Sequence, residues 1–215
     1  MTVLLADPEI IALPVHDTGE RLVPVPADTV APGIERPLVR AGVAARLAVA
    51  QLLLPPGRRL RVVEGHRTPD DQLRIWRRYA AEVRAAHPGA DAAEQRLLTS
   101  RFVSPIEVAP HVAGAAVDVT RVDRLGAEVD LGTRIDATPE KSRGACSTDA
   151  AVGPAAHEER RLLMMAMAGA GFINYPTEWW HWSHGDRYWA WAVRAPAALY
   201  GPIEATAPTL ALVGR

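Results

Sequence analysis

Cysteine is nearly absent from this sequence, since Cys146 is the only one among 215 residues. A single cysteine excludes an intrachain disulfide, and a reducing cytoplasm is the compartment that this composition favours. Cys146 lies in a stretch rich in Ser, Thr, Gly and Asp. We therefore interpret it as a thiol without a catalytic role.

Net charge and long apolar runs are lacking as well. The formal net charge is -1, so charge gives no argument for nucleic acid or an anionic membrane, and small neutral or zwitterionic partners stay open. No segment is long and apolar enough to cross a bilayer. The first residues have no basic region, and Asp7 and Pro8 end their apolar run, which is not typical of a secretory signal. We expect a cytoplasmic protein of undetermined oligomeric state.

The length and the balance of residue types predict one globular domain over residues 1–215. Charged residues make up 23% and apolar residues 48% of the chain, as in ordinary soluble proteins, and this length suits one sizeable core. Residues 1–37 contain closely spaced prolines and are expected to form an extended arm that wraps the core. Residues 121–156 are expected to be mostly loop, part of it over the active site.

Hydrophobic spacing and capping residues predict an α+β fold in which helices flank a small antiparallel sheet. In the second predicted helix, Leu73, Trp76, Ala80 and Val83 form the expected buried stripe. Helices are predicted from Pro37 to Leu54, from Pro69 to about His87, from Asp91 to about Phe102 and from Glu158 to Ala168, and strands at Leu60–Val63, Ala115–Thr120 and within Phe172–Ser183.

Two stretches combine residue types that bind metals with surroundings poor in water. The first runs from His111 to Asp118, and the second is Glu178-Trp-Trp-His181. A hydrolytic zinc site needs three protein ligands and one open position, and His111, Asp118 and His181 supply that number. A carboxylate that is not a ligand must then move protons, for which Glu178 is the candidate.

Taken singly, each of these residues has a more common structural role. His111 would be a loop histidine bonded to the backbone, His181 a half-buried sheet histidine, Asp118 an acid at a strand end and Glu178 a surface acid. A straight strand also places residues three apart on opposite faces. Glu178 and His181 can therefore share a site only if the chain turns between them.

The two stretches together resemble the zinc D,D-peptidases, and most closely the VanX-type D-alanyl-D-alanine dipeptidases. The likeness rests on His111-x-x-Gly-x-Ala-x-Asp118 followed by Glu178-x-x-His181, and it covers roughly residues 38 to 190. It implies a compact α+β zinc-peptidase fold with one Zn2+ per chain and a cytoplasmic location.

Two further segments are similar to segments of that family. The segment from Glu64 to Pro69 resembles one ending in Tyr-Arg-Pro, which would make Arg67 the residue that stabilises the oxyanion. The segment from Asp130 to Asp136 resembles Asp-Met-Gly-Thr-x-Phe-Asp, and by that likeness Asp136 would pair with the free amino group of a dipeptide.

The sequence also departs from the family pattern. Where the family has a serine that helps to hold the substrate carboxylate, two residues before the first ligand, this chain has Ala109. Ser104 is a nearby candidate for that role.

The function expected from the resemblance is zinc-dependent hydrolysis of a small D,D-dipeptide such as D-alanyl-D-alanine. The alternatives are a related D,D-carboxypeptidase or cell-wall endopeptidase, and a metal-binding module that recognises a ligand without catalysis. Antibiotic resistance, recycling of cell-wall dipeptides and processing of a metabolite are all compatible roles. A divalent metal other than zinc also stays open.

Overall fold

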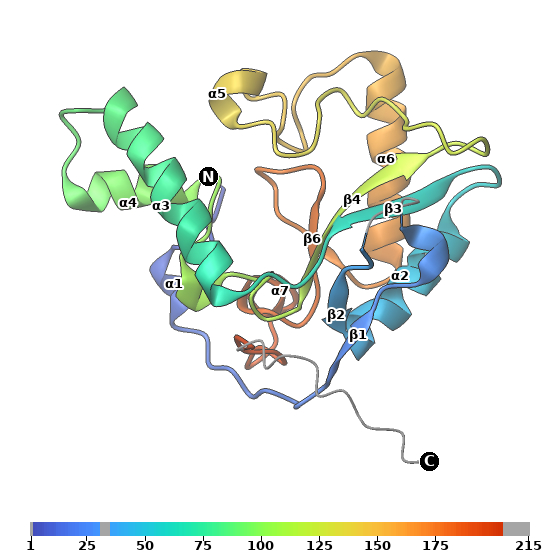
Figure 1. Ribbon diagram of the computed structural model, residues 1–215, viewed down its shortest axis with the longest axis horizontal. Helices are drawn as coiled ribbons and strands as arrows, with labels where there is room; N and C mark the ends of the chain where they lie inside the picture. Colours follow the sequence, from blue (N-terminus) through green and yellow to red (C-terminus); the bar gives the residue numbers. More distant parts are fainter. Residues whose placement is uncertain (1, 31–34, 204–215) are drawn as a thin grey trace.

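The computed structural model describes residues 2–30 and 35–203 and confirms the α+β fold class (Figure 1). Four antiparallel strands form the main sheet in the order β3-β4-β6-β5, and β1 and β2 form a separate sheet. None of the helices in these two ranges is both long and apolar enough to cross a bilayer.

The strands are β1 (Leu22–Pro24), β2 (Leu38–Arg40), β3 (Arg59–Glu64), β4 (Ala116–Val122), β5 (Ile173–Asn174) and β6 (His181–Ser183). The helices are α1 (Pro8–Ile11), α2 (Ala41–Leu53), α3 (Pro69–Ala86), α4 (Ala92–Ser100), α5 (Pro139–Ser142), α6 (Pro154–Gly169) and α7 (Arg187–Val193), with 3-10 turns η1 (Ala27–Thr29) and η2 (Ile106–Val108).

Helices α2 and α6 pack together on one side of the main sheet and enclose the hydrophobic core (Figure 1). Because side chains alternate along a strand, Val117 and Val119 of β4 belong to this core while Asp118 lies on the opposite face. The strand predicted at Ala115–Thr120 thus corresponds to β4. The alternation leaves one face of the sheet for the core and the other for polar side chains.

Helix α3 lies on the opposite side of the sheet from α2 and α6 (Figure 1). It begins as predicted, with the Thr68 hydroxyl accepting from the Asp71 amide at 3.2 Å. Its predicted buried stripe is confirmed at Val83, whereas Leu73, Trp76 and Ala80 are only half-buried. Gln72 and Tyr79, which the predicted stripe did not include, are buried. Polar contacts of Gln72, described below, turn this face inward.

The N-terminal arm contains more regular structure than the prolines predicted. Strands β1 and β2 pair with each other, so α2 begins at Ala41 rather than directly after Pro37. The arm also contains α1. Val15 of the arm forms a parallel bridge with Ala198 near the far end of the described chain.

A buried arginine of α6 holds the long segment 121–156. Arg160 is 4% exposed, and its charge would be costly to bury without hydrogen bonds. Its donors reach the carbonyls of Leu131, Ala145 and Ser147 at 2.7, 2.7 and 2.8 Å. The segment contains α5 between long loops, and α6 begins at Pro154 rather than at Glu158.

The core between α2 and the sheet generates a stability prediction. Leu47 is fully buried, whereas Leu52 on the same helix is 83% exposed. Leu47→Ala should lower the free energy of unfolding by about 2–5 kcal/mol, because it leaves a cavity. The matched change Leu52→Ala should alter it by less than about 0.5 kcal/mol. Urea unfolding followed by circular dichroism measures both, and equal losses for the two variants would contradict the described packing.

Candidate metal centre and active site

Strand register places two acidic side chains and one histidine in one row across the main sheet. Asp118 of β4 pairs with His181 of β6 on one side and with Glu64 of β3 on the other. The pairing of β3 with β4 shifts register between Val62 and Glu64, as at a β-bulge, which re-aims the side chain that follows it. Residues far apart in sequence thus become direct cross-strand neighbours.

A tight loop before β4 holds His111 against this row. The Nδ1 of His111 lies 2.7 Å from the Gly65 carbonyl oxygen. The backbone carbonyl of His111 accepts hydrogen bonds from the amides of Arg67 and Gly114 at 3.2 and 3.0 Å. A side chain at position 65 would put a Cβ 2.5 Å from the Leu38 carbonyl oxygen. Glycine there lets the backbone come close enough to orient the imidazole.

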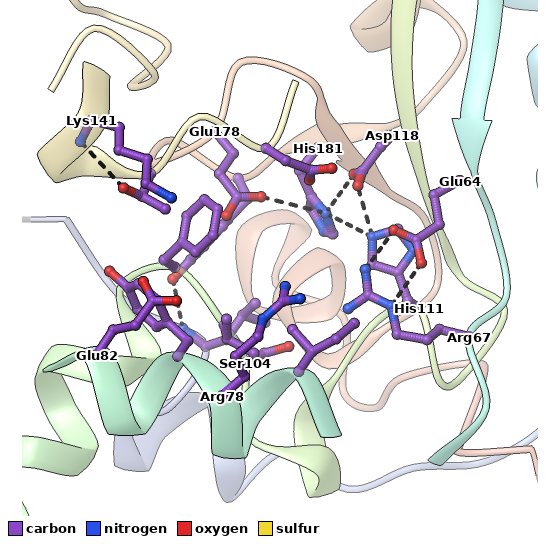
Figure 2. A pocket seen from close by; sticks show the side chains of 18 residues that line it. Glu64, Arg67, Arg78, Glu82, Ser104, His111, Asp118, Lys141, Glu178 and His181 are labelled. Carbon is purple, nitrogen blue, oxygen red and sulfur yellow. Dashed lines mark hydrogen bonds and ion pairs between the residues drawn. The ribbon is translucent and has the colours of Figure 1, made fainter. Parts of the chain in front are cut away.

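The three predicted ligand atoms form a nearly equilateral triangle (Figure 2). His111 Nε2 lies 3.2 Å from His181 Nδ1, and Asp118 Oδ1 lies 3.1 Å from His181 Nδ1 and 3.3 Å from His111 Nε2. Ligands bound at about 2.0–2.1 Å to a tetrahedral zinc ion are about 3.3 Å apart, because the tetrahedral angle fixes that ratio. The group therefore fits one metal ion.

When both imidazole rings are neutral, hydrogen bonds alone do not satisfy this triangle. With Nδ1 of His111 donating to Gly65, the Nε2 of a neutral ring carries a lone pair, and Asp118 Oδ1 is also an acceptor. One proton on His181 Nδ1 cannot serve both neighbours along straight hydrogen bonds. His181 Nε2 is buried without a hydrogen-bond partner in the described part of the chain. A cation shared by the three lone pairs removes the conflict.

Glu178 joins the site because the chain turns between Tyr175 and His181, as the spacing required. The Glu178 amide donates to the Tyr175 carbonyl at 2.9 Å, and the His181 amide donates to the Glu178 carbonyl at 3.2 Å. The side-chain amide of Asn174 donates to the carbonyls of Glu178 and His181 at 3.0 and 2.9 Å. Glu178 Oε2 consequently lies 4.0 Å from His181 Nδ1, beside the triangle but outside it.

A second hydrogen-bonded chain ties this segment to the long loop. The Trp179 indole donates to the Thr133 hydroxyl at 2.7 Å, and its backbone amide donates to the Cys146 carbonyl at 3.0 Å. Arg160 stacks over the Trp179 ring at 5.6 Å. The turn that carries Glu178 is therefore fixed from the core side as well.

Burial and neighbouring charges shift the pKa values of the two central acids, Asp118 and Glu178, in opposite directions. Burial opposes ionisation of Asp118, but the neighbouring histidines outweigh it and hold the pKa of this carboxyl well below its usual range. Burial raises the pKa of Glu178 well above its usual range, and the charges of Asp118 and Asp136 add to that effect. Environments that separate the pKa values of two neighbouring carboxyls are typical of sites for acid–base chemistry.

Arg67 is oriented by two residues whose role was not predicted. Its Nε and Nη2 donate to the two carboxylate oxygens of Glu64 at 2.7 and 2.5 Å, and its Nη1 donates to the Gln72 side chain at 2.7 Å. Gln72 in turn donates to the Ser104 carbonyl at 2.7 Å. A buried glutamine on a helix gives no sequence signal of its own, because its partners come from other elements.

A cavity of about 450 Å³ opens onto the triangle and is lined by Asp136 and Ser104 (Figure 2). Asp136 has a φ of 62°, a left-handed conformation that aspartate tolerates better than most residues. Partial removal from water, together with Asp118 and Glu64, raises its pKa. Ala109 is 3% exposed and does not line the cavity.

Three other histidines lie at the surface. His16, His87 and His157 are exposed and lie outside the metal-ligand group. The structure brings together His111, Asp118, His181, Glu178, Arg67, Asp136 and Ser104 around one cavity.

Comparisons with known proteins show which family and which relatives this chain resembles. A family model described as D-ala-D-ala dipeptidase matches residues 28–196. A D-alanyl-D-alanine dipeptidase of Synechocystis is 37% identical over 117 residues, 47% of this chain and 47% of the relative. One of Escherichia coli is 38% identical over 71 residues, 33% of this chain and 35% of the relative. One of Enterococcus faecalis is 31% identical over 114 residues, 50% of this chain and 52% of the relative. The chain spans about half the length of these relatives, or less.

Two solved structures are distantly similar. One is a mutant of the vancomycin resistance D,D-pentapeptidase VanY in complex with Zn(II), with 18% identity, a TM-score of 0.44, and coverage of 82% of this chain and 87% of that chain. The other is VanYB in complex with D-alanine-D-alanine, with 19% identity, a TM-score of 0.46, and coverage of 83% and 87%.

The triangle of ligand atoms predicts how metal binding responds to substitution. The chain should bind one zinc ion, and His111→Ala should lower the affinity by more than the roughly 10- to 100-fold that outer-shell changes cost. The control His157→Ala, at an exposed helix position, should bind zinc normally. Competition with a chromogenic chelator measures the affinity, and unchanged binding by the His111 variant would rule out this ligand.

Proposed function

This chain belongs to the family of D-Ala-D-Ala dipeptidases, and on that premise we propose that it hydrolyses a small D,D-dipeptide, most simply D-alanyl-D-alanine, with one zinc ion per chain. Membership confirms the resemblance predicted from the two motifs. One observation carries the proposal: three buried ligand atoms lie 3.1–3.3 Å apart with an acid outside the group beside them. This is the arrangement that metal-assisted hydrolysis requires.

His111, Asp118 and His181 would hold the zinc ion. Their three atoms leave a fourth position open, as in catalytic rather than structural zinc sites. When bound, zinc supplies a Lewis acid that polarises a carbonyl and lowers the pKa of a water. The Gly65 carbonyl keeps Nδ1 of His111 protonated, so this residue presents Nε2 to the metal.

Glu178 is proposed to move the protons of the reaction. Its carboxylate stands outside the ligand group and 4.0 Å from His181 Nδ1, where it can accept a proton from the attacking water and later deliver it to the departing amine. Asn174 bonds the carbonyls of Glu178 and His181. This keeps the base and the ligand in fixed relation.

Arg67 is proposed to stabilise the negative oxygen that develops on the attacked carbonyl. Glu64 and Gln72 already engage three of its five donors and hold the guanidinium plane in place. A donor fixed before the reaction stabilises charge without reorganising during it. Glu64 and Gln72 would therefore act through Arg67 as positioning residues.

The two remaining predicted residues bear on substrate choice. Asp136 lines the cavity and is proposed to pair with the free ammonium group of the dipeptide, and Ser104 is proposed to contribute a hydroxyl near the substrate carboxylate. Ala109 cannot take the part that the family serine has, because it offers no side-chain donor and lies outside the cavity wall.

The wider setting of the activity is also proposed. We place the enzyme in the cytoplasm, in accord with its single buried free cysteine. We also regard residues 1–215 as one domain. Contacts between the arm and distant parts of the chain support the latter, because Asp17 pairs with Arg40 and the Leu5 amide donates to the Tyr175 hydroxyl.

The role given to Glu178 predicts a separation of binding from turnover. Glu178→Gln keeps the shape of the side chain but cannot accept a proton, so it should retain one zinc per chain and lose about 10²–10⁴-fold in kcat. Metal analysis and a free-D-alanine assay on the same sample measure the two quantities. Glu94→Ala, at an exposed acid, is the control, and near-normal turnover by the Gln variant would refute the role.

The pairing of Asp136 with an ammonium group predicts the order of substrates. D-alanyl-D-alanine should be hydrolysed with a kcat/KM at least about tenfold above that of its N-acetyl derivative, since charged hydrogen bonds contribute about 1.5–3 kcal/mol. Asp136→Asn should reduce this preference. The alternative carboxypeptidase or endopeptidase would instead cleave the acylated peptide as well or better, and a catalytically inert module would cleave neither.

A further inference from the structure

One face of α3 forms a wall of the cavity. Ile75, Arg78, Tyr79 and Glu82 all line it, and their spacing of i, i+3, i+4 and i+7 is that of one helix face. One turn nearer the start of the same helix, Gln72 bonds to Arg67. The wall therefore leads from the catalytic arginine outward along α3.

Arg78 is the charged residue of this wall that points toward the reaction site. Figure 2 shows its guanidinium rising from α3 into the space between Glu178 and Arg67. Elsewhere on the helix, Arg74 and Arg84 are hydrogen-bonded to other side chains. The guanidinium of Arg78 has no such partner among residues 2–30 and 35–203, and this includes Glu82 one turn further on.

Two other positions near the cavity do not supply a cation for the substrate carboxylate. Arg67 donates three hydrogen bonds to Glu64 and Gln72 and is assigned above to the attacked carbonyl. Ala109, at the position of the family serine, offers no donor. A dipeptide nevertheless carries a free carboxylate on the leaving residue, and covering that charge without a cation is costly.

We propose that Arg78 binds the C-terminal carboxylate of the substrate and is a specificity-determining residue of this enzyme; this rests on the proposed dipeptidase function. The planar guanidinium can donate two parallel hydrogen bonds to a carboxylate. Asp136 and Arg78 carry opposite charges and would orient the dipeptide, with its ammonium group toward Asp136 and its carboxylate toward Arg78 on α3. Recognition of the substrate's C-terminal carboxylate by Arg78 would then replace the hydrogen bond that the family serine gives to this group.

A second cation faces the cavity from the opposite side. Lys141 of α5 also lines it (Figure 2), and among the described residues its ammonium group has no hydrogen-bond or ion-pair partner. Unlike Arg78, it lies on a short helix in the long loop. It adds positive potential to the cavity, and in this proposal Arg78 supplies the direct contact.

The test compares D-alanyl-D-alanine with D-alanyl-D-alanine amide, which lacks the terminal charge. The wild-type enzyme should prefer the acid, and Arg78→Ala should raise KM for the acid about 10-fold or more with kcat changed only a few-fold. The same variant should leave the amide unaffected, and Arg78→Lys should recover part of the preference. Arg77→Ala is the matched control, because Arg77 is equally exposed on α3 but does not line the cavity.

A binding measurement separates failure of this proposal from failure of the proposed function. Calorimetry with zinc-loaded Glu178→Gln protein, with and without Arg78→Ala, gives Kd for the acid and the amide without turnover. An acid preference that survives loss of Arg78 in both assays overturns the proposal while the dipeptidase function stands. Absence of both hydrolysis and binding of the dipeptide overturns both.

Discussion

Three lone pairs brought together in a buried place are the constraint on which this structure depends. His111 Nε2, Asp118 Oδ1 and His181 Nδ1 lie within 3.1–3.3 Å of one another, and two neutral imidazole rings cannot satisfy all of them with hydrogen bonds. Burying such a cluster is costly unless a cation compensates it. The rest of the molecule maintains this arrangement and surrounds it with an acid, an arginine and a cavity wide enough for a small substrate.

The scaffold supplies that arrangement through contacts between distant segments. The sheet aligns Glu64, Asp118 and His181 by register, so the row is as rigid as the strands that form it. The turn that carries Glu178 is held by Asn174 from one side and by the loop bonded to Arg160 from the other. Sites built on such supported elements keep their geometry better than sites on free loops.

The sequence predicts those features that depend on local patterns and on motif chemistry. The start of α3 at Pro69, the strand that carries Asp118 and the two stretches that contain the ligands all follow from neighbouring residues. Features set by tertiary partners could not be predicted in this way. Leu73 and Trp76 of α3 are less buried than predicted because Gln72 turns inward to meet Arg67, and α2 begins at Ala41 because the preceding residues pair with a strand of the arm. Local periodicity contains no information about such partners.

The most direct test of the account is a crystal structure of the zinc-loaded protein with anomalous diffraction recorded on both sides of the zinc absorption edge. The account predicts one anomalous peak per chain, about 2.0–2.1 Å from His111 Nε2, Asp118 Oδ1 and His181 Nδ1, with Glu178 outside bonding distance. A peak bound elsewhere, or one that lacks any of these three ligands, would contradict it.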